Sequence, residues 1–107
     1  MDNNYDTAKL LVTSFVDAIP RDSLTELLPS HIDITNYKAV KKALRLLVVT
    51  RLLQSRYSIY FVDLTPKQVA SLLGITVHEC RETYFSAIQS LATQSDADQL
   101  AYLTSLL

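Results

Sequence analysis

The sequence predicts an all-α fold, a small single-domain bundle of about five to six helices. The chain of 107 residues contains one glycine and three prolines, too few for the many turns of an all-β protein. Leucine and alanine, which favour helix, dominate its periodic segments. Because 49% of the residues are hydrophobic, the chain can bury a core, and residues 1–107 are expected to form one domain.

The N-terminal segment, residues 1–35, is expected to be helical. Apolar side chains recur at helical spacing over residues 3–19, and a proline directly after them ends this first helix. Ser23 followed by Glu26 matches a capping box, which predicts a short second helix that Pro29 stops. The apolar positions assigned to the inner face of the first helix are Leu11, Phe15, Ala18 and Ile19.

A long helix is expected over residues 36–55, and it carries most of the positive charge. The formal net charge is −1 in total, but it is −4 over residues 1–37, +6 over 38–62 and −3 over 63–107. Arg51 lies on the apolar side of this helix, where a long side chain can snorkel or pair with an acid. The basic residues that share the opposite face are Lys38, Lys41, Lys42, Arg45 and Arg56.

This basic face has two interpretations. It can grip phosphates of a nucleic acid, with Lys67 as a further phosphate candidate, and binding would then depend steeply on salt. It can instead be a solvated face that offsets the acidic N-terminal segment by pairing with Asp17, Asp22 or Glu26.

Residues 57–62 combine β-branched and aromatic side chains, which suits a strand. A single strand would have no partner, so an extended or helical connection packed on the core is expected instead. Tyr57, Tyr60 and Phe61 are therefore assigned to a core cluster rather than to stacking on nucleic-acid bases.

Two helices joined by a tight turn are expected over residues 65–73 and 76–92. Thr65 can cap the first helix, with Pro66 at its first position and Gln68 completing a capping box. Gly74 ends this helix, because glycine enters the left-handed conformation without strain.

Thr76 begins the second helix, and Glu79 stands at the position that a second capping box requires. At 100° per residue, one face of this helix is apolar and points to the core. The residues on that core face are Val77, Cys80, Tyr84, Ala87, Ile88 and Leu91.

The spacing of Ala70, Gly74 and Ile75 is typical of helix-turn-helix proteins. Residues 64–91 most resemble region 4, the DNA-binding domain of bacterial sigma factors. This resemblance implies that residues 36–92 form a basic helix plus a helix-turn-helix, whose second helix enters the major groove of double-stranded DNA. The positions that match the end of that helix in the family are Ala87, Ile88 and Leu91.

The resemblance implies that His78, Arg81, Glu82 and Gln89 face the base edges. Arginine reads guanine, glutamine reads adenine and glutamate accepts from cytosine N4. The chain departs from the family in one respect: sigma-type recognition helices carry several basic residues on this face, whereas here Arg81 stands beside two glutamates.

Two functions follow as hypotheses. The first is a small helix-turn-helix transcriptional regulator that binds double-stranded DNA. The second is a protein-binding adaptor on the same scaffold, whose acidic outer face and Phe85 contact a transcription protein such as RNA polymerase.

A final helix is expected in residues 93–107, with Ser95 as its cap. Its apolar stripe leaves two alternatives open: it closes the core, or it pairs with a second copy in a homodimer. The stripe consists of Leu100, Leu103, Leu106 and Leu107.

Other chemistries are not expected. His78 and Cys80 have no third metal ligand nearby, and Cys80 resembles a small buried apolar residue. One glycine cannot build a glycine-rich phosphate loop, and no catalytic spacing is evident, so neither enzyme activity nor a cofactor is predicted. The longest apolar run, residues 46–49, is too short for a membrane span, and a cytoplasmic location is expected.

Overall fold

The structure is a computed structural model that describes residues 3–93 and 96–107. Every regular element among these residues is helical, which confirms the expected all-α class. The α-helices are α1 (Tyr5–Ala18), α2 (Leu24–Leu27), α3 (Tyr37–Leu53), α4 (Pro66–Leu73), α5 (Val77–Glu79), α6 (Phe85–Thr93) and α7 (Ala97–Ser105). Two 3₁₀-helices, η1 (Arg21–Ser23) and η2 (Arg56–Phe61), and a π-helical turn, η3 (Cys80–Tyr84), complete the regular structure.

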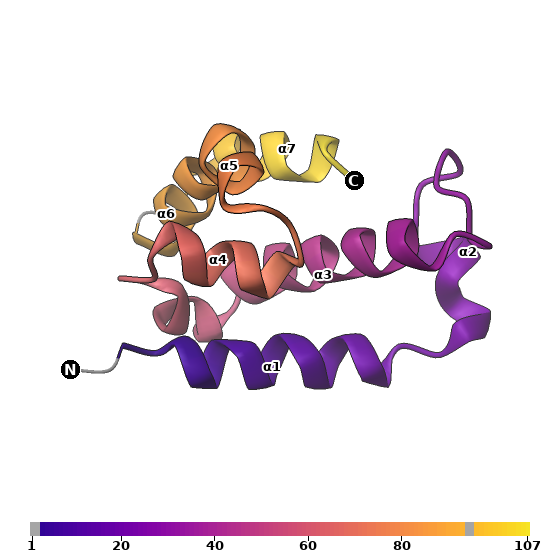
Figure 1. The fold of residues 1–107 in the computed structure, drawn as a ribbon, viewed down its shortest axis with the longest axis horizontal. Coiled ribbons are helices and arrows are strands. Elements are labelled where there is room, and N and C mark those ends of the chain that lie inside the picture. The colour runs from indigo at the N-terminus through magenta and orange to yellow at the C-terminus, as the bar shows by residue number, and fades with distance from the viewer. Residues whose placement is uncertain (1–2, 94–95) are drawn as a thin grey trace.

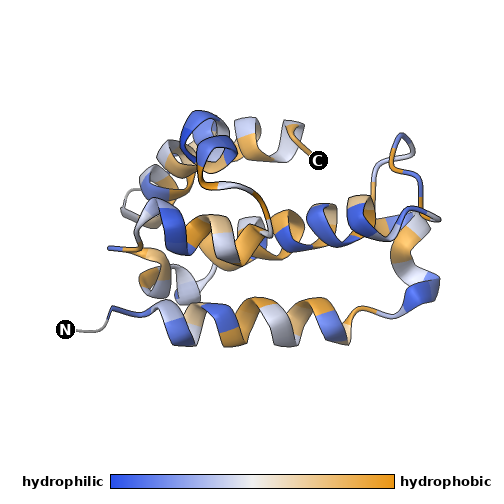
Figure 2. Ribbon diagram, in the orientation of Figure 1, coloured by the Kyte–Doolittle hydropathy of each residue, from blue (hydrophilic) through white to orange (hydrophobic). Residues whose placement is uncertain are grey.

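The helix α3 lies at the centre of the fold and contacts α1, α4, α6, α7 and η2. Figure 1 shows α1 running along one side of α3, while α6 and α7 lie on the other side. Apolar positions recur along the length of α3, and hydrophilic positions gather around α5 at the outer edge of the molecule (Figure 2). One continuous core therefore forms around α3.

The expected inner face of the first helix is only partly right: Leu11 and Ile19 pack partly buried against the core, but the most buried positions are others. Ala8, Val12 and Val16 are the buried residues of α1, whereas Phe15 is 45% exposed. Of the other expected inner residues, Ala18 is also exposed. The small side chain of Ala8 and the two valines let α1 approach α3 and α4 closely, and the larger apolar residues lie along its flank.

Of the capping boxes expected at Thr65 and Ser23, only the one at Thr65 forms. At Thr65 both bonds form, because Gln68 N donates to the hydroxyl and Thr65 N donates to the Gln68 side chain. The box predicted at Ser23 does not form, because Ser23 ends η1 with a helical backbone (φ −87°, ψ −5°) instead of the extended conformation that an N-cap adopts.

The ambiguous segment after α3 forms the 3₁₀-helix η2, one of the two connections expected. Phe61 is fully buried, and Tyr57 and Tyr60 pack against the core with their rings stacked 6.4 Å apart. The predicted core cluster is therefore confirmed.

The terminal helix α7 packs on α6 and α3. Leu103 is fully buried and Leu107 is buried, so the leucine stripe closes the core. Asp96 caps α7 by accepting from the backbone N–H groups of Asp98 and Gln99. The cap expected at Ser95 lies outside the described residues. Over the part of the chain that the structure describes, none of the helices has the length and apolar character of a membrane span.

Candidate nucleic-acid interface

The turn between α4 and α5 is built by Gly74, whose φ of +71° lies in the left-handed region. The backbone N–H of Ile75 donates to the carbonyl of Ala70 over 3.0 Å, which closes the end of α4 in the manner of a Schellman motif. Ala70 is buried and Ile75 packs partly against the core. The turn therefore has the local geometry that its sequence predicts.

Replacing Gly74 should destabilise the protein through its backbone. A side chain at this φ costs roughly 1–2 kcal/mol, so G74A should lower the melting temperature by about 5 °C or more. G74N should lose less, because asparagine tolerates the left-handed region. Both substitutions place a Cβ against the Arg45 guanidinium, so this close contact is common to the two variants. Thermal unfolding followed by circular dichroism measures the two melting temperatures. Equal losses in G74A and G74N would contradict a cost that comes from the backbone.

The second helix begins at Thr76, whose hydroxyl accepts from the backbone N–H of Glu79 over 3.1 Å. The expected capping box is only half formed here. The Glu79 carboxylate does not return to the Thr76 backbone but binds Lys42 of α3 at 2.7 Å. An ion partner from a distant part of the sequence thus replaces the local one.

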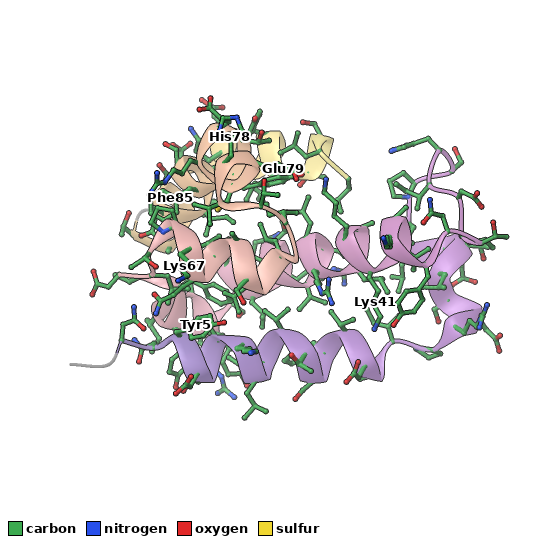
Figure 3. The ribbon with its side chains drawn as sticks, viewed as in Figure 1. Tyr5, Lys41, Lys67, His78, Glu79 and Phe85 are labelled. Carbon is green, nitrogen blue, oxygen red and sulfur yellow. The ribbon has the colours of Figure 1, made fainter. Side chains whose placement is uncertain are left out.

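The predicted core face of this second helix is confirmed, with Val77 partly buried and the rest buried. Three of the predicted base-facing residues, His78, Arg81 and Glu82, are exposed. Figure 3 shows His78 at the outer edge of the molecule, on α5.

Gln89, the fourth predicted base-facing residue, is engaged within the protein. Its side-chain amide donates to the carbonyl of Phe61 over 3.0 Å. The π-helical turn accounts for this position: Phe85 N–H bonds to Cys80 O, five residues back, so later residues are rotated away from a regular 3.6-residue spacing. Periodicity alone gives no signal of such a turn.

The predicted basic face is divided among several partners. Lys41 lies between α3 and α1 (Figure 3), 3.8 Å from Asp17 and 5.5 Å from the centre of the Tyr37 ring. Asp17 is thus one of the acids that the sequence proposed as a partner, while Asp22 and Glu26 form no ion pair within the described residues.

Lys42 is the cation held most firmly on α3. The hydrogen bond from its ammonium to Glu79, with a smaller contribution from charge, raises the pKa of Lys42. This contact joins the basic helix to the start of the second helix of the turn. No sequence pattern predicts this pair, because the two residues lie 37 positions apart.

The remaining phosphate candidates differ in surroundings. The Arg45 guanidinium lies against Gly74, and Arg56 lies over the Tyr57 ring at 5.2 Å. Lys38 and Lys67 are exposed and belong to no ion pair within the described residues. Among the predicted phosphate candidates, these two lysines are therefore the most available to an anionic partner.

Cys80 is fully buried between the turn and the core. Burial raises the pKa of its thiol, which stays protonated at neutral pH. No set of three His, Cys, Asp or Glu side chains is grouped as metal ligands within residues 3–93 and 96–107.

A comparison with known protein families, curated proteins and solved structures finds no significant match for this chain. The likeness of residues 64–91 to sigma factor region 4 therefore remains a prediction from their sequence pattern.

Proposed function

We propose that this chain is a small helix-turn-helix transcriptional regulator that binds double-stranded DNA. The observation that carries the proposal is the pair of capped helices, α4 and α5–α6, joined through left-handed Gly74, with His78, Arg81 and Glu82 exposed on the second. In such proteins the second helix lies in the major groove with its N-terminal residues at the base edges, and the first crosses the backbone.

The exposed cations fit this placement. Arg81 lies in the first turns of the second helix, where an arginine can donate two hydrogen bonds to guanine. Lys67 lies on α4 and Lys38 on α3, and both are free to contact phosphate. Lys41 and Lys42 would first have to leave Asp17 and Glu79, so their contribution to phosphate binding is smaller.

A second candidate function is a protein-binding adaptor of the transcription machinery. The ion pairs that Lys41 and Lys42 form with acidic residues favour it. Acidic partners neutralise two of the six basic residues of residues 38–62, while Glu82 stays exposed beside Arg81. The adaptor would contact a basic surface through this part of the second helix. Phe85, also predicted as a contact, is partly buried against the core, so Glu82 is the residue that defines this surface.

DNA binding is tested by fluorescence anisotropy with a duplex of mixed sequence over a salt series. The K38A/K67A variant removes two phosphate contacts. The negative slope of log K for DNA association against log salt should therefore become shallower by about 2. The R81A variant should bind about 5- to 100-fold more weakly. E82Q should bind more tightly, because it removes a negative charge near the phosphates. The matched control is R21A, which replaces an exposed arginine of η1, directly before α2; Figure 1 shows α2 at the opposite end of the molecule from α5.

The two candidate functions give different results in this experiment. Salt-insensitive binding, no binding, or an equal loss in R21A would overturn the DNA-binding proposal. The adaptor function would then predict that E82R destroys binding to a basic transcription protein while K38A/K67A preserves it. Sedimentation of the free and DNA-bound protein tests the homodimer that a two-fold operator would require.

A further inference from the structure

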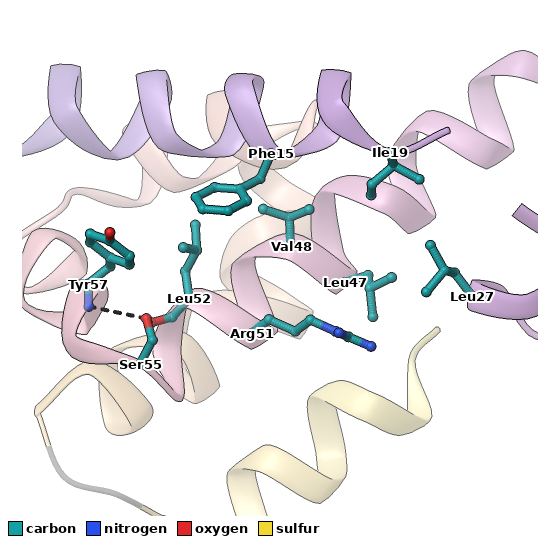
Figure 4. A pocket seen from close by; sticks show the side chains of 9 residues that line it. All are labelled: Phe15, Ile19, Leu27, Leu47, Val48, Arg51, Leu52, Ser55 and Tyr57. Carbon is teal, nitrogen blue, oxygen red and sulfur yellow. Dashed lines mark hydrogen bonds between the residues drawn. The ribbon is translucent and has the colours of Figure 1, made fainter. Parts of the chain in front are cut away.

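An apolar cleft of about 350 Å³ opens between α1, α2, α3 and η2, on residues that DNA binding does not use. Figure 4 shows Phe15, Ile19, Leu27 and Leu47 around it, with Val48 and Leu52 between them. Its volume is near the lower end of the range for small-molecule sites, about 300–1,000 Å³. The exposed ring of Phe15 is part of its wall.

Arg51 supplies the one charged group among the described residues that line this cleft. It differs from Lys41 and Lys42 of the same helix, because no acidic side chain lies within 4.0 Å of it in the described residues. Its aliphatic stem borders the apolar wall, and it also lines the adjoining hollow beside Thr50 and Gln54. The guanidinium therefore lies beside an apolar surface, and it has no ion-pair partner within 4.0 Å among the described residues.

The other polar groups of the cleft offer less to a ligand. The Ser55 hydroxyl donates to the carbonyl of Leu52 over 2.7 Å and accepts from the backbone N–H of Tyr57 over 3.1 Å. The Tyr57 hydroxyl accepts from Arg56 over 3.3 Å. Arg51 thus determines which polar group an occupant should carry.

We propose that this cleft binds an amphipathic monocarboxylate, a medium-chain fatty acid, with its chain against the apolar wall and its carboxylate on the Arg51 guanidinium. A planar guanidinium matches a carboxylate through two parallel N–H···O bonds. The small volume favours such a ligand over a partner helix, and the lone cation favours an anion over a neutral or cationic amphiphile.

Calorimetric titration of the full chain with decanoate, in the absence of DNA, tests the proposal. Decanoate should bind once per chain, and R51Q should weaken it about tenfold or more, because charge-assisted bonds are lost. Decanol should bind R51Q and the parent protein within about twofold of each other, since it makes no ion pair. K38Q removes an equal charge from the exposed start of α3 and should leave decanoate binding unchanged.

A second variant tests the cleft itself. Leu47 is partly exposed, so L47W should fill the cleft while the protein still folds, and both decanoate and decanol should be lost. Circular dichroism confirms folding. Failure of decanoate to saturate below its micellar concentration, or an equal loss in K38Q, would overturn the proposal. So would a free protein that forms a dimer through Phe15 and binds no decanoate, since a second copy would then occupy the cleft. The result is independent of DNA binding.

Discussion

F61A should destabilise the protein by about 3–5 kcal/mol, the largest effect expected of any single change considered. Phe61 is fully buried in η2, between α3 and α6, and it is among the largest side chains sealed from solvent. Its removal leaves a cavity that the surrounding helices cannot close, because η2 is also tied to α6 through the Gln89 bond to the Phe61 carbonyl. Urea unfolding measures the loss as a lower midpoint.

The matched control lies two residues away. Ile59 belongs to the same short helix but is 60% exposed, and I59A should change the free energy of unfolding by less than about 0.5 kcal/mol. The F61L variant, which refills part of the volume, should fall between the two. Equal midpoints for F61A and I59A would show that η2 does not hold the core together.

The elements that the sequence predicted well depend on contacts between residues at most five positions apart in the chain. The Gly74 turn and the Thr65 capping box form as expected, because each uses groups that are neighbours along the chain. Asn36 likewise starts α3 by accepting from the backbone N–H of Ala39. Such local bonds need no knowledge of the rest of the fold.

The predictions that failed depend on what packs against an element. The Ser23 pattern satisfies the capping rule, yet the backbone there continues from η1 and leaves no cap position. The inner face of α1 is set by how closely α3 and α4 approach, which the apolar spacing of a single helix does not reveal. The π-helical turn also divides one expected helix into α5 and α6, so the helix count exceeds the prediction.

In the candidate site, too, local features were predictable from the sequence, and features that depend on distant residues were not. The exposed positions of His78, Arg81 and Glu82 agree with helical spacing, because the register shift of the π-helical turn, closed by the bond from Phe85 N–H to Cys80 O, acts on the residues that follow it. The state of the basic face does not, because Lys42 meets an acid from a distant part of the chain. Charge runs in the sequence report how many cations are present, while only the fold determines which of them are already neutralised.

L103A should destabilise the protein by about 2–5 kcal/mol, and this loss should not depend on protein concentration. Leu103 is fully buried where α7 packs on α6 and α3, so its methyl groups complete the core of the same chain. The neighbouring Tyr102 is 43% exposed, and Y102A should change stability by less than about 0.5 kcal/mol.

Thermal unfolding at two protein concentrations that differ a hundredfold distinguishes the two roles of the leucine stripe. If the stripe held two copies together, the melting temperature of the parent protein would rise with concentration and L103A would abolish that rise. A stripe that closes its own core gives one melting temperature at both concentrations and a fixed loss in the variant. Because Leu103 is fully buried within its own chain, we expect the latter.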